Sequence, residues 1–116
     1  MGKCKDEIPP TATPLWVDVR DVALAHVKSI EVEAAANKRF FVVGGVFSIR
    51  EIAQSVRKHY PDTPNLPTDK TPGGDLPEGG VFGYDNSRSK EVLGLSYRSL
   101  DESIKDTVNS FKAVGA

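Results

Sequence analysis

The sequence of 116 residues has little cysteine and no long apolar run. Its single cysteine, Cys4, excludes a disulfide within the chain and a zinc site built from several cysteines, and it suits the reducing cytoplasm. No apolar run approaches the roughly 18 residues that a membrane-spanning helix requires. The first residues, MGKCKD, lack the apolar segment of a secretory signal peptide. These absences predict a cytoplasmic chain without a membrane segment.

The sequence also lacks an excess of charge of either sign. Fifteen Lys and Arg residues stand against 16 Asp and Glu residues, which gives a net charge of -1. Neither nucleic acid nor an anionic membrane surface is therefore an expected partner. Hydrophobic residues make up 39% of the sequence, which at this length allows one domain, or part of one, with a modest core.

The stretch LWVDVRDVALAHVKSI, residues 15–30, combines a short strand, a helix cap and an amphipathic helix. Its first three apolar residues predict a buried strand, and the side-chain oxygen of Asp18 is suited to cap the helix that follows. In that helix, apolar residues recur at the spacing of one helical face. We expect this face to lie in the core: Val19, Val22, Ala23, His26, Val27 and Ile30.

Two residues of this stretch could carry chemistry, Asp21 as a general base and His26 as a ligand or proton carrier. Asp21 stands at the third helical position, where the helix dipole and free N–H groups favour a carboxylate, so we expect a structural role. His26 has no second His, Cys or carboxylate at a ligand spacing, so we expect a packed, hydrogen-bonded core histidine. No metal site is predicted.

The string VDVRDVALAHV, residues 17–27, resembles the segment after the Rossmann core in the extended short-chain dehydrogenases/reductases of the NAD-dependent epimerase/dehydratase superfamily. Its form is similar to the branch of dihydroflavonol reductases, cinnamoyl-CoA reductases and fungal NADPH-dependent methylglyoxal and ketone reductases. Epimerases and dehydratases tend to carry His or Met in place of Asp18 or Arg20. The rest of the chain resembles the last third of these enzymes, most of all the fungal group. The resemblance implies an α/β fold, the C-terminal substrate-domain portion of an extended Rossmann-type reductase, with short strands, about four helices and no N-terminal dinucleotide-binding core.

Proline and glycine mark two irregular segments. Three prolines in residues 1–14 predict an extended lead-in linker before the C-terminal substrate-domain portion, residues 15–116. Residues 61–80 hold five of the eight prolines and four of the ten glycines, which predicts a long loop. This loop either covers a site or is a disordered insertion. We expect it to be the most mobile internal segment and, in a complete enzyme, to border the substrate entrance.

The apolar run from Phe40 to Val43 predicts a strand that is covered on both faces in a parallel sheet. The resemblance implies that it is the final strand at the edge of the Rossmann sheet. Without that sheet, we expect the chain to self-associate or to remain loosely packed. Gly44 and Gly45 follow in the string GGVFSI, which is not the G-x-G-x-x-G fingerprint, so a chain reversal is predicted there and not a phosphate-binding turn.

Three further helices are predicted. Ser48 with Glu51, and Ser99 with Glu102, have the spacing of capping boxes at the beginning of two of them. Gly94 is suited to end a short helix between these two. The inner face of the last helix is expected to consist of Leu100, Ile104, Thr107, Val108 and Phe111.

The catalytic pair of the short-chain reductases is missing. In that family a Tyr, with its pKa lowered by a Lys four residues along, protonates the carbonyl oxygen while NADPH supplies hydride. The residues four places after the three tyrosines are Pro64, Arg88 and Asp101. We therefore predict no catalytic and no cofactor-binding residue, and no NADPH binding by this chain alone. By resemblance, the complete enzyme uses NADPH.

Three aromatic side chains are candidates for the wall of a substrate pocket: Trp16, Phe82 and Tyr84. By resemblance, the last two lie near the substrate cavity of the reductases, although an aromatic pair is more often part of a core.

The sequence thus predicts part of an NAD(P)H-dependent oxidoreductase that reduces aldehydes or ketones, with a small carbonyl substrate and a missing N-terminal Rossmann portion as partners. Two alternatives stay open, a stand-alone α/β module that binds a protein or ligand, and a fragment of a sugar-nucleotide epimerase or dehydratase.

Overall fold

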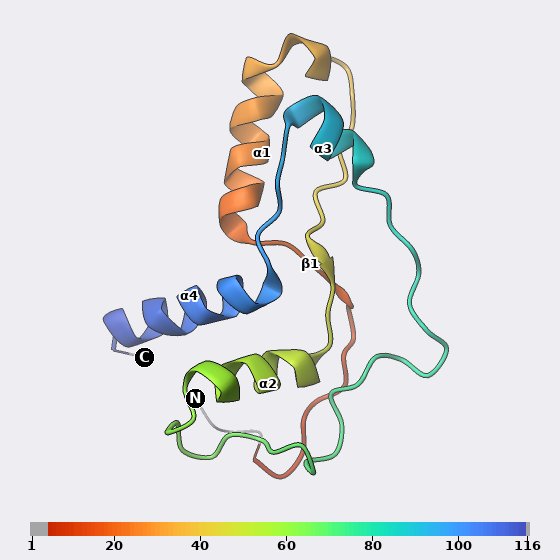
Figure 1. Ribbon diagram of the computed structural model, residues 1–116. Helices are drawn as coiled ribbons and strands as arrows, with labels where there is room; N and C mark the ends of the chain where they lie inside the picture. Colours follow the sequence, from red (N-terminus) through yellow and green to blue (C-terminus); the bar gives the residue numbers. More distant parts are fainter. Residues whose placement is uncertain (1–4, 116) are drawn as a thin grey trace.

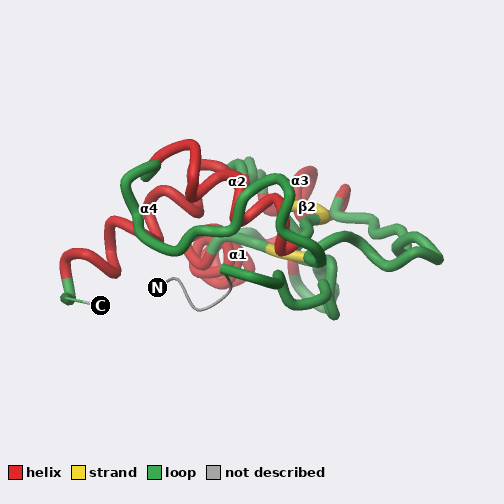
Figure 2. The backbone as a smooth tube through the Cα atoms, turned by 90° about the horizontal axis from the view of Figure 1, so that it is seen from below, coloured by secondary structure: helices red, strands yellow, loops and turns green. Residues whose placement is uncertain are grey.

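The computed structural model describes residues 5–115, which form a flat assembly of 50 × 38 × 17 Å (Figures 1 and 2). Cys4 lies outside the described residues. Two short strands and four α-helices confirm the expected α/β class. The elements in chain order are β1 (Leu15–Trp16), α1 (Val19–Glu31), the 3-10 turn η1 (Glu33–Ala35), β2 (Gly45–Val46), α2 (Ile49–His59), α3 (Ser87–Leu93) and α4 (Leu100–Ala113).

The two strands form a small antiparallel sheet in which Leu15 lies opposite Val46 and Trp16 opposite Gly45. The Gly44 N–H donates to the Trp16 carbonyl at 2.7 Å. The predicted chain reversal at the glycine pair is therefore wrong. Instead, both glycines let the Trp16 indole approach the backbone, because a Cβ would lie 3.4 Å from the ring at position 44 and 3.2 Å from its Nε1 at position 45.

The segment from Phe40 to Val43 forms no strand among the described residues. A strand needs a neighbour to complete its hydrogen bonds, and residues 5–115 offer none to this segment. Phe40 and Val42 pack on the core, whereas the side chain of Phe41 is 51% exposed. The prediction of a strand covered on both faces is thus wrong for this chain by itself. The core on which the segment packs consists of Ala25, Ala35, Leu93 and Leu95.

Helix α1 begins as predicted but buries a different face. Asp18 caps it by accepting the N–H of Arg20 at 2.8 Å. The buried side chains are those of Asp21 and Ala25. The expected core face is largely open because no described element covers it, and Ile30 is 87% exposed. We name its exposed apolar members the open face of α1: Val19, Ala23, Val27 and Ile30.

His26 lies on the exposed side of α1, so the prediction of a core histidine is wrong. Its ring is hydrogen-bonded, as expected, through Nδ1 at 2.8 Å from the Val22 carbonyl oxygen. This local bond to the preceding helical turn satisfies one ring nitrogen without a second chain segment. The ring therefore needs neither a metal nor a buried partner.

Helices α2 and α4 pack against each other (Figure 1). The capping box of α2 is complete, since the Ser48 N–H donates to the Glu51 carboxylate at 2.7 Å and the Ser48 hydroxyl accepts the Glu51 N–H. The box of α4 is half formed, with only the N–H of Glu102 donating to Ser99. Val108 is the buried residue of α4. Helix α3 ends at Gly94 in the left-handed conformation, as predicted.

The lead-in lies against the long loop near the beginning of α2 (Figure 1). Ile8 is 2% exposed, and its N–H donates to the Pro72 carbonyl at 2.9 Å. Arg50 of α2 donates to the Gly73 carbonyl and to the Asp75 carboxylate. The part of the loop around residue 73 is therefore fastened from two sides, whereas residues 75–80 are exposed.

Candidate functional site

Two of the three predicted pocket residues approach Gly45. The Trp16 indole reaches this position from β1, and the Tyr84 side chain reaches it from the segment before α3. A Cβ on residue 45 would lie 3.2 Å from Trp16 Nε1 and 3.9 Å from the Tyr84 hydroxyl oxygen. Both side chains thus lie close to the backbone of β2 at Gly45. We name the group Trp16, Gly45 and Tyr84 the aromatic site.

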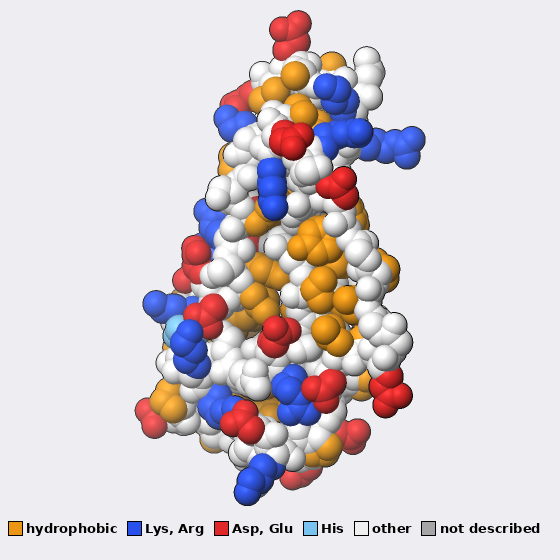
Figure 3. Space-filling model, turned by 45° about the vertical axis from the view of Figure 1, so that its right-hand side comes forward, with side chains coloured by type: hydrophobic (Ala, Val, Ile, Leu, Met, Phe, Trp, Pro, Cys, Tyr) orange, Lys and Arg blue, Asp and Glu red, His pale blue; other side chains and the backbone are white. Residues whose placement is uncertain are grey.

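Phe82 is not among the side chains that approach Gly45, and it is 62% exposed. It lies two residues before Tyr84, in an extended stretch without strand partners in the described chain. Apolar side chains also gather in the middle of one face of the molecule, inside a rim of charged groups (Figure 3). An exposed Phe side chain is consistent with contact to something outside this chain, but not with a closed pocket within it.

The charged residues of the VDVRDVA motif hold helix α4. Arg20 donates to the Asp18 carboxylate and, from its other nitrogen, to Asp106 of α4 at 2.8 Å. The Arg20 guanidinium holds the pKa of the Asp18 carboxyl well below its usual range, mainly through these hydrogen bonds. Asp18 is thus an ionised cap, and the motif fastens the beginning of α1 to α4.

Asp21 also holds the segment at the beginning of α4. It is 1% exposed and accepts the backbone N–H of Arg98 at 2.9 Å, while the Arg98 guanidinium pairs with its other oxygen. Its partners thus lie 77 positions away, and not in its own first helical turn, where the helix dipole was expected to hold it. No acceptor position is left facing solvent for a substrate proton, so a general base at Asp21 is not supported.

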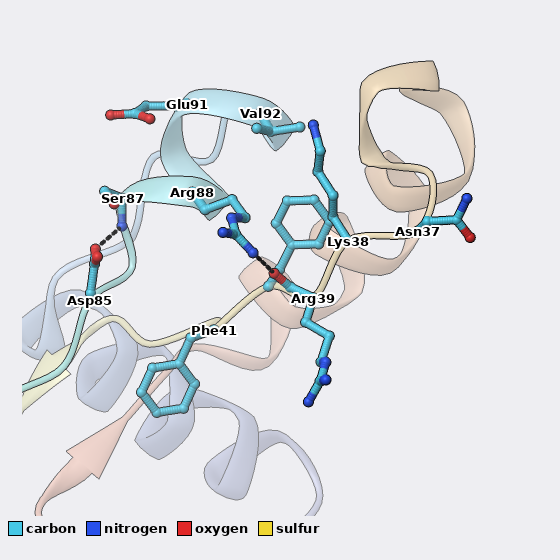
Figure 4. A pocket seen from close by; sticks show the side chains of 10 residues that line it. Asn37, Lys38, Arg39, Phe41, Asp85, Ser87, Arg88, Glu91 and Val92 are labelled. Carbon is cyan, nitrogen blue, oxygen red and sulfur yellow. Dashed lines mark hydrogen bonds between the residues drawn. The ribbon is translucent and has the colours of Figure 1, made fainter.

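A large cavity lies away from the aromatic site, between the segment 37–41 and α3 (Figure 4). It has a volume of about 1000 Å³ and is widely open. The Arg88 guanidinium donates to the Arg39 carbonyl, and the side chains of Lys38 and Arg39 point in opposite directions. The cavity therefore presents no convergent charges. Its apolar wall includes the exposed ring of Phe41.

Comparison with known proteins finds relatives along nearly the full chain. A ketoreductase of Aspergillus niger is 45% identical over 112 residues, which are 95% of this chain and 32% of that protein. The NADPH-dependent methylglyoxal reductase of Saccharomyces cerevisiae is 30% identical over 95 residues, 81% of this chain and 28% of that protein. The crystal structure of Gre2 from Candida albicans with NADPH superposes with a TM-score of 0.76 at 31% identity, over 97% of this chain and 35% of that one.

The chain matches the C-terminal third of the extended short-chain dehydrogenases/reductases. This confirms the resemblance that the motif VDVRDVA indicated. The chain spans about a third of the length of the relatives it matches. No family model matches the chain.

The glycine pair of this reductase part does not form the phosphate-binding turn of a dinucleotide site. A dinucleotide diphosphate needs backbone N–H groups that are free to approach it after a strand, and Gly44 and Gly45 are covered by the Trp16 indole. Among residues 5–115, no group of three or more His, Cys, Asp or Glu side chains could hold a metal ion. No helix in the same range is both long and apolar enough to cross a membrane.

The sequence pattern pointed to Trp16 and Tyr84 separately but did not predict that both approach Gly45. The glycine was read as part of a turn, although the bulky neighbour in β1 was a signal for close backbone approach. The sequence around Asp21 does not predict its pairing with Arg98, because the two residues belong to segments that are far apart in the chain. Both omissions concern contacts between segments far apart in the sequence.

Proposed function

We propose that this chain is the C-terminal part of an NADPH-dependent oxidoreductase that reduces aldehydes or ketones to alcohols. In this proposal the chain supplies substrate-pocket walls, with Trp16, Phe82 and Tyr84 as the residues concerned, and the last strand of the sheet. It is not catalytic alone. Its partners are an N-terminal Rossmann portion, which binds NADPH and provides the proton donor, and a small carbonyl substrate. Such an enzyme works in the cytoplasm.

The similarity to a third of each reductase carries the proposal. Two surfaces support it. The open face of α1 exposes apolar side chains in a row, which water disfavours unless another element covers them. The segment from Phe40 to Val43 is extended and lacks strand partners within residues 5–115, so a neighbouring strand could pair with it. Both surfaces suit a junction with the Rossmann portion.

Reconstitution tests the proposal. We expect this chain, mixed with the separately expressed N-terminal two thirds of the Aspergillus niger ketoreductase, to form a soluble complex that oxidises NADPH when a carbonyl substrate is added. Phe41→Asp should prevent this, because burying an unpaired charge at the junction costs several kcal/mol. Since Phe41 is 51% exposed, the same change should leave the isolated chain folded. Size-exclusion chromatography and NADPH absorbance are the measurements.

A monomeric chain that melts cooperatively and gives no activity on mixing would instead support the stand-alone module. Equal reconstitution by the Phe41→Asp variant would show that the segment from Phe40 to Val43 lies outside the junction. Activity that appears only with a sugar nucleotide would favour the epimerase or dehydratase fragment.

The isolated chain should bind neither NADPH nor NADP at micromolar concentrations. The glycine fingerprint is missing, and the glycine pair that follows Val43 is covered by an indole ring. Calorimetric titration measures this directly. A saturable heat with a dissociation constant below about 10 μM, which is a binding free energy of about −7 kcal/mol, would contradict the proposal that the N-terminal portion binds the cofactor.

A further inference from the structure

We propose that residues 76–83 form a flap that closes on the ring of Phe41 and covers the segment from Phe40 to Val43 until a strand from outside takes its place. The structure shows the open position, in which Phe82 is 62% exposed and Phe41 is 51% exposed. Closure within the isolated chain does not depend on the proposed function. Displacement of the flap by the N-terminal Rossmann portion rests on that function.

The flap is held at both ends. Just before it, the Gly74 carbonyl accepts the Arg50 N–H at 3.0 Å, which fastens the chain to the beginning of α2. Just after it, the Asn86 side chain donates to the Val43 carbonyl at 2.7 Å, and Asn86 is buried. The second end is therefore attached to the same segment that contains Phe41.

Between these two ends nothing fastens the flap. None of the hydrogen bonds found within residues 5–115 joins residues 76–83 to another segment, and the stretch runs apart from the helices (Figure 1). Its three glycines, Gly79, Gly80 and Gly83, have no heavy atom within 4 Å of a Cβ position. Glycine without steric contacts changes its backbone angles at little cost. The flap can therefore move while its ends stay in place.

The second end brings Phe82 within reach of Phe41. Phe82 stands four residues before Asn86. Phe41 stands two residues before Val43, whose carbonyl accepts the Asn86 hydrogen bond. An extended chain spans up to about 13 Å over four residues and about 7 Å over two. Phe41 and Asp85 line the same open cavity, and the Phe41 side chain points to the side on which Asp85 lies (Figure 4). A rotation within the flap therefore lets the two rings meet.

Contact between the two rings is favourable because it removes apolar surface of both from water. Aromatic pairs also attract each other in edge-to-face and offset arrangements. The cavity beside Phe41 has a volume of about 1000 Å³, which leaves room for a second ring. A closed flap lies across the segment from Phe40 to Val43 and competes with any strand that approaches it. When such a strand binds, Phe82 is released and becomes available to the wall of the substrate pocket.

Nuclear magnetic resonance of the isolated chain tests closure. With isotope-labelled phenylalanine, the parent should show a nuclear Overhauser cross-peak between the rings of Phe41 and Phe82, which arises only when the rings come together. Phe82→Ala should shift the Phe41 ring resonances. Leu76→Ala is the matched control and should not shift them, because this side chain is also exposed but stands next to the fastened beginning of the flap. Absence of the cross-peak in the parent would overturn the inference.

Binding to the N-terminal two thirds of the Aspergillus niger ketoreductase tests the competition. Phe82→Ala should bind this portion about threefold more tightly than the parent, because a flap that has lost its ring contact stays open. Leu76→Ala should bind as the parent does. Calorimetric titration gives the three dissociation constants. Equal or weaker binding by Phe82→Ala would show that the flap does not compete with the junction, and the inference would be wrong.

Failure of the proposed function gives a different result. In that case neither the parent nor any variant binds the N-terminal portion, while the cross-peak between Phe41 and Phe82 persists in the isolated chain. Conversely, tight binding and carbonyl-dependent NADPH oxidation without the cross-peak would leave the proposed function standing and remove the flap.

Discussion

Replacing Asp21 by Ala should lower the free energy of unfolding by about 3 kcal/mol, which is a large share of the roughly 5–15 kcal/mol that a folded domain possesses. The Asp21 carboxylate is 1% exposed and accepts both the backbone N–H and the guanidinium of Arg98. The change removes both interactions and leaves a half-buried cation without its main partner. Because Arg98 stands directly before the cap of α4, we expect α4 to loosen from α1.

Glu102→Ala provides the matched control. Glu102 is the other carboxylate near Arg98, at 3.7 Å, and its side chain is 52% exposed. An exposed pair of this kind contributes about 0.2–1 kcal/mol, so this variant should unfold almost as the parent does. Urea titration followed by Trp16 fluorescence compares the two variants in one experiment. If both variants lose the same stability, burial does not set the strength of the pair, and the role given to Asp21 is wrong.

The local features of the fold could be predicted from the sequence because their signals lie within a few residues. The Asp18 cap, the complete Ser48 capping box and the Gly94 helix end each depend on one side chain and the backbone next to it. The apolar period of α1 predicted a helix correctly. The same period predicted the buried face of α1 wrongly. Periodicity shows which face of a helix is apolar, but it does not show whether another element of this chain packs on that face.

The same distinction explains the error at the segment from Phe40 to Val43. Its composition indicates a strand buried on both faces, and a strand exists only where a neighbour completes the ladder. Within residues 5–115 the neighbour is absent, so the side chain of Phe41 faces solvent. The apolar pattern of a segment can therefore indicate a buried strand even where the described residues do not include the strands that would bury it.

The sequence named three aromatic residues as pocket candidates, and the structure brings two of them, Trp16 and Tyr84, close to Gly45. Their role as pocket walls stays a prediction. Phe82, chosen on the same grounds, stays exposed. Which aromatic side chains come close to β2 depends on the path of the segment before α3, and this path has no local signature in the sequence.

Gly73→Ala should destabilise the chain about as strongly as the loss of Asp21. A Cβ at residue 73 would lie 2.1 Å from the Ile8 carbonyl oxygen, a distance that no relaxation of a side chain can relieve, since the obstacle is backbone. The φ angle of +87° adds a strain of about 1–2 kcal/mol for any residue other than glycine. The lead-in must then detach, and the buried side chain of Ile8 loses roughly 1.5–3 kcal/mol of hydrophobic stabilisation.

Gly79→Ala is the control in the same loop. No heavy atom lies within 4 Å of a Cβ at residue 79, and its φ angle is not in the left-handed region. This variant should stay within about 0.5 kcal/mol of the parent. Hydrogen exchange at the Ile8 amide gives the local readout, because that N–H donates to the Pro72 carbonyl at 2.9 Å. Gly73→Ala should accelerate this exchange strongly and Gly79→Ala should not. Slow exchange at Ile8 in the Gly73→Ala variant would mean that the lead-in is held elsewhere, and that its contact with the loop contributes little.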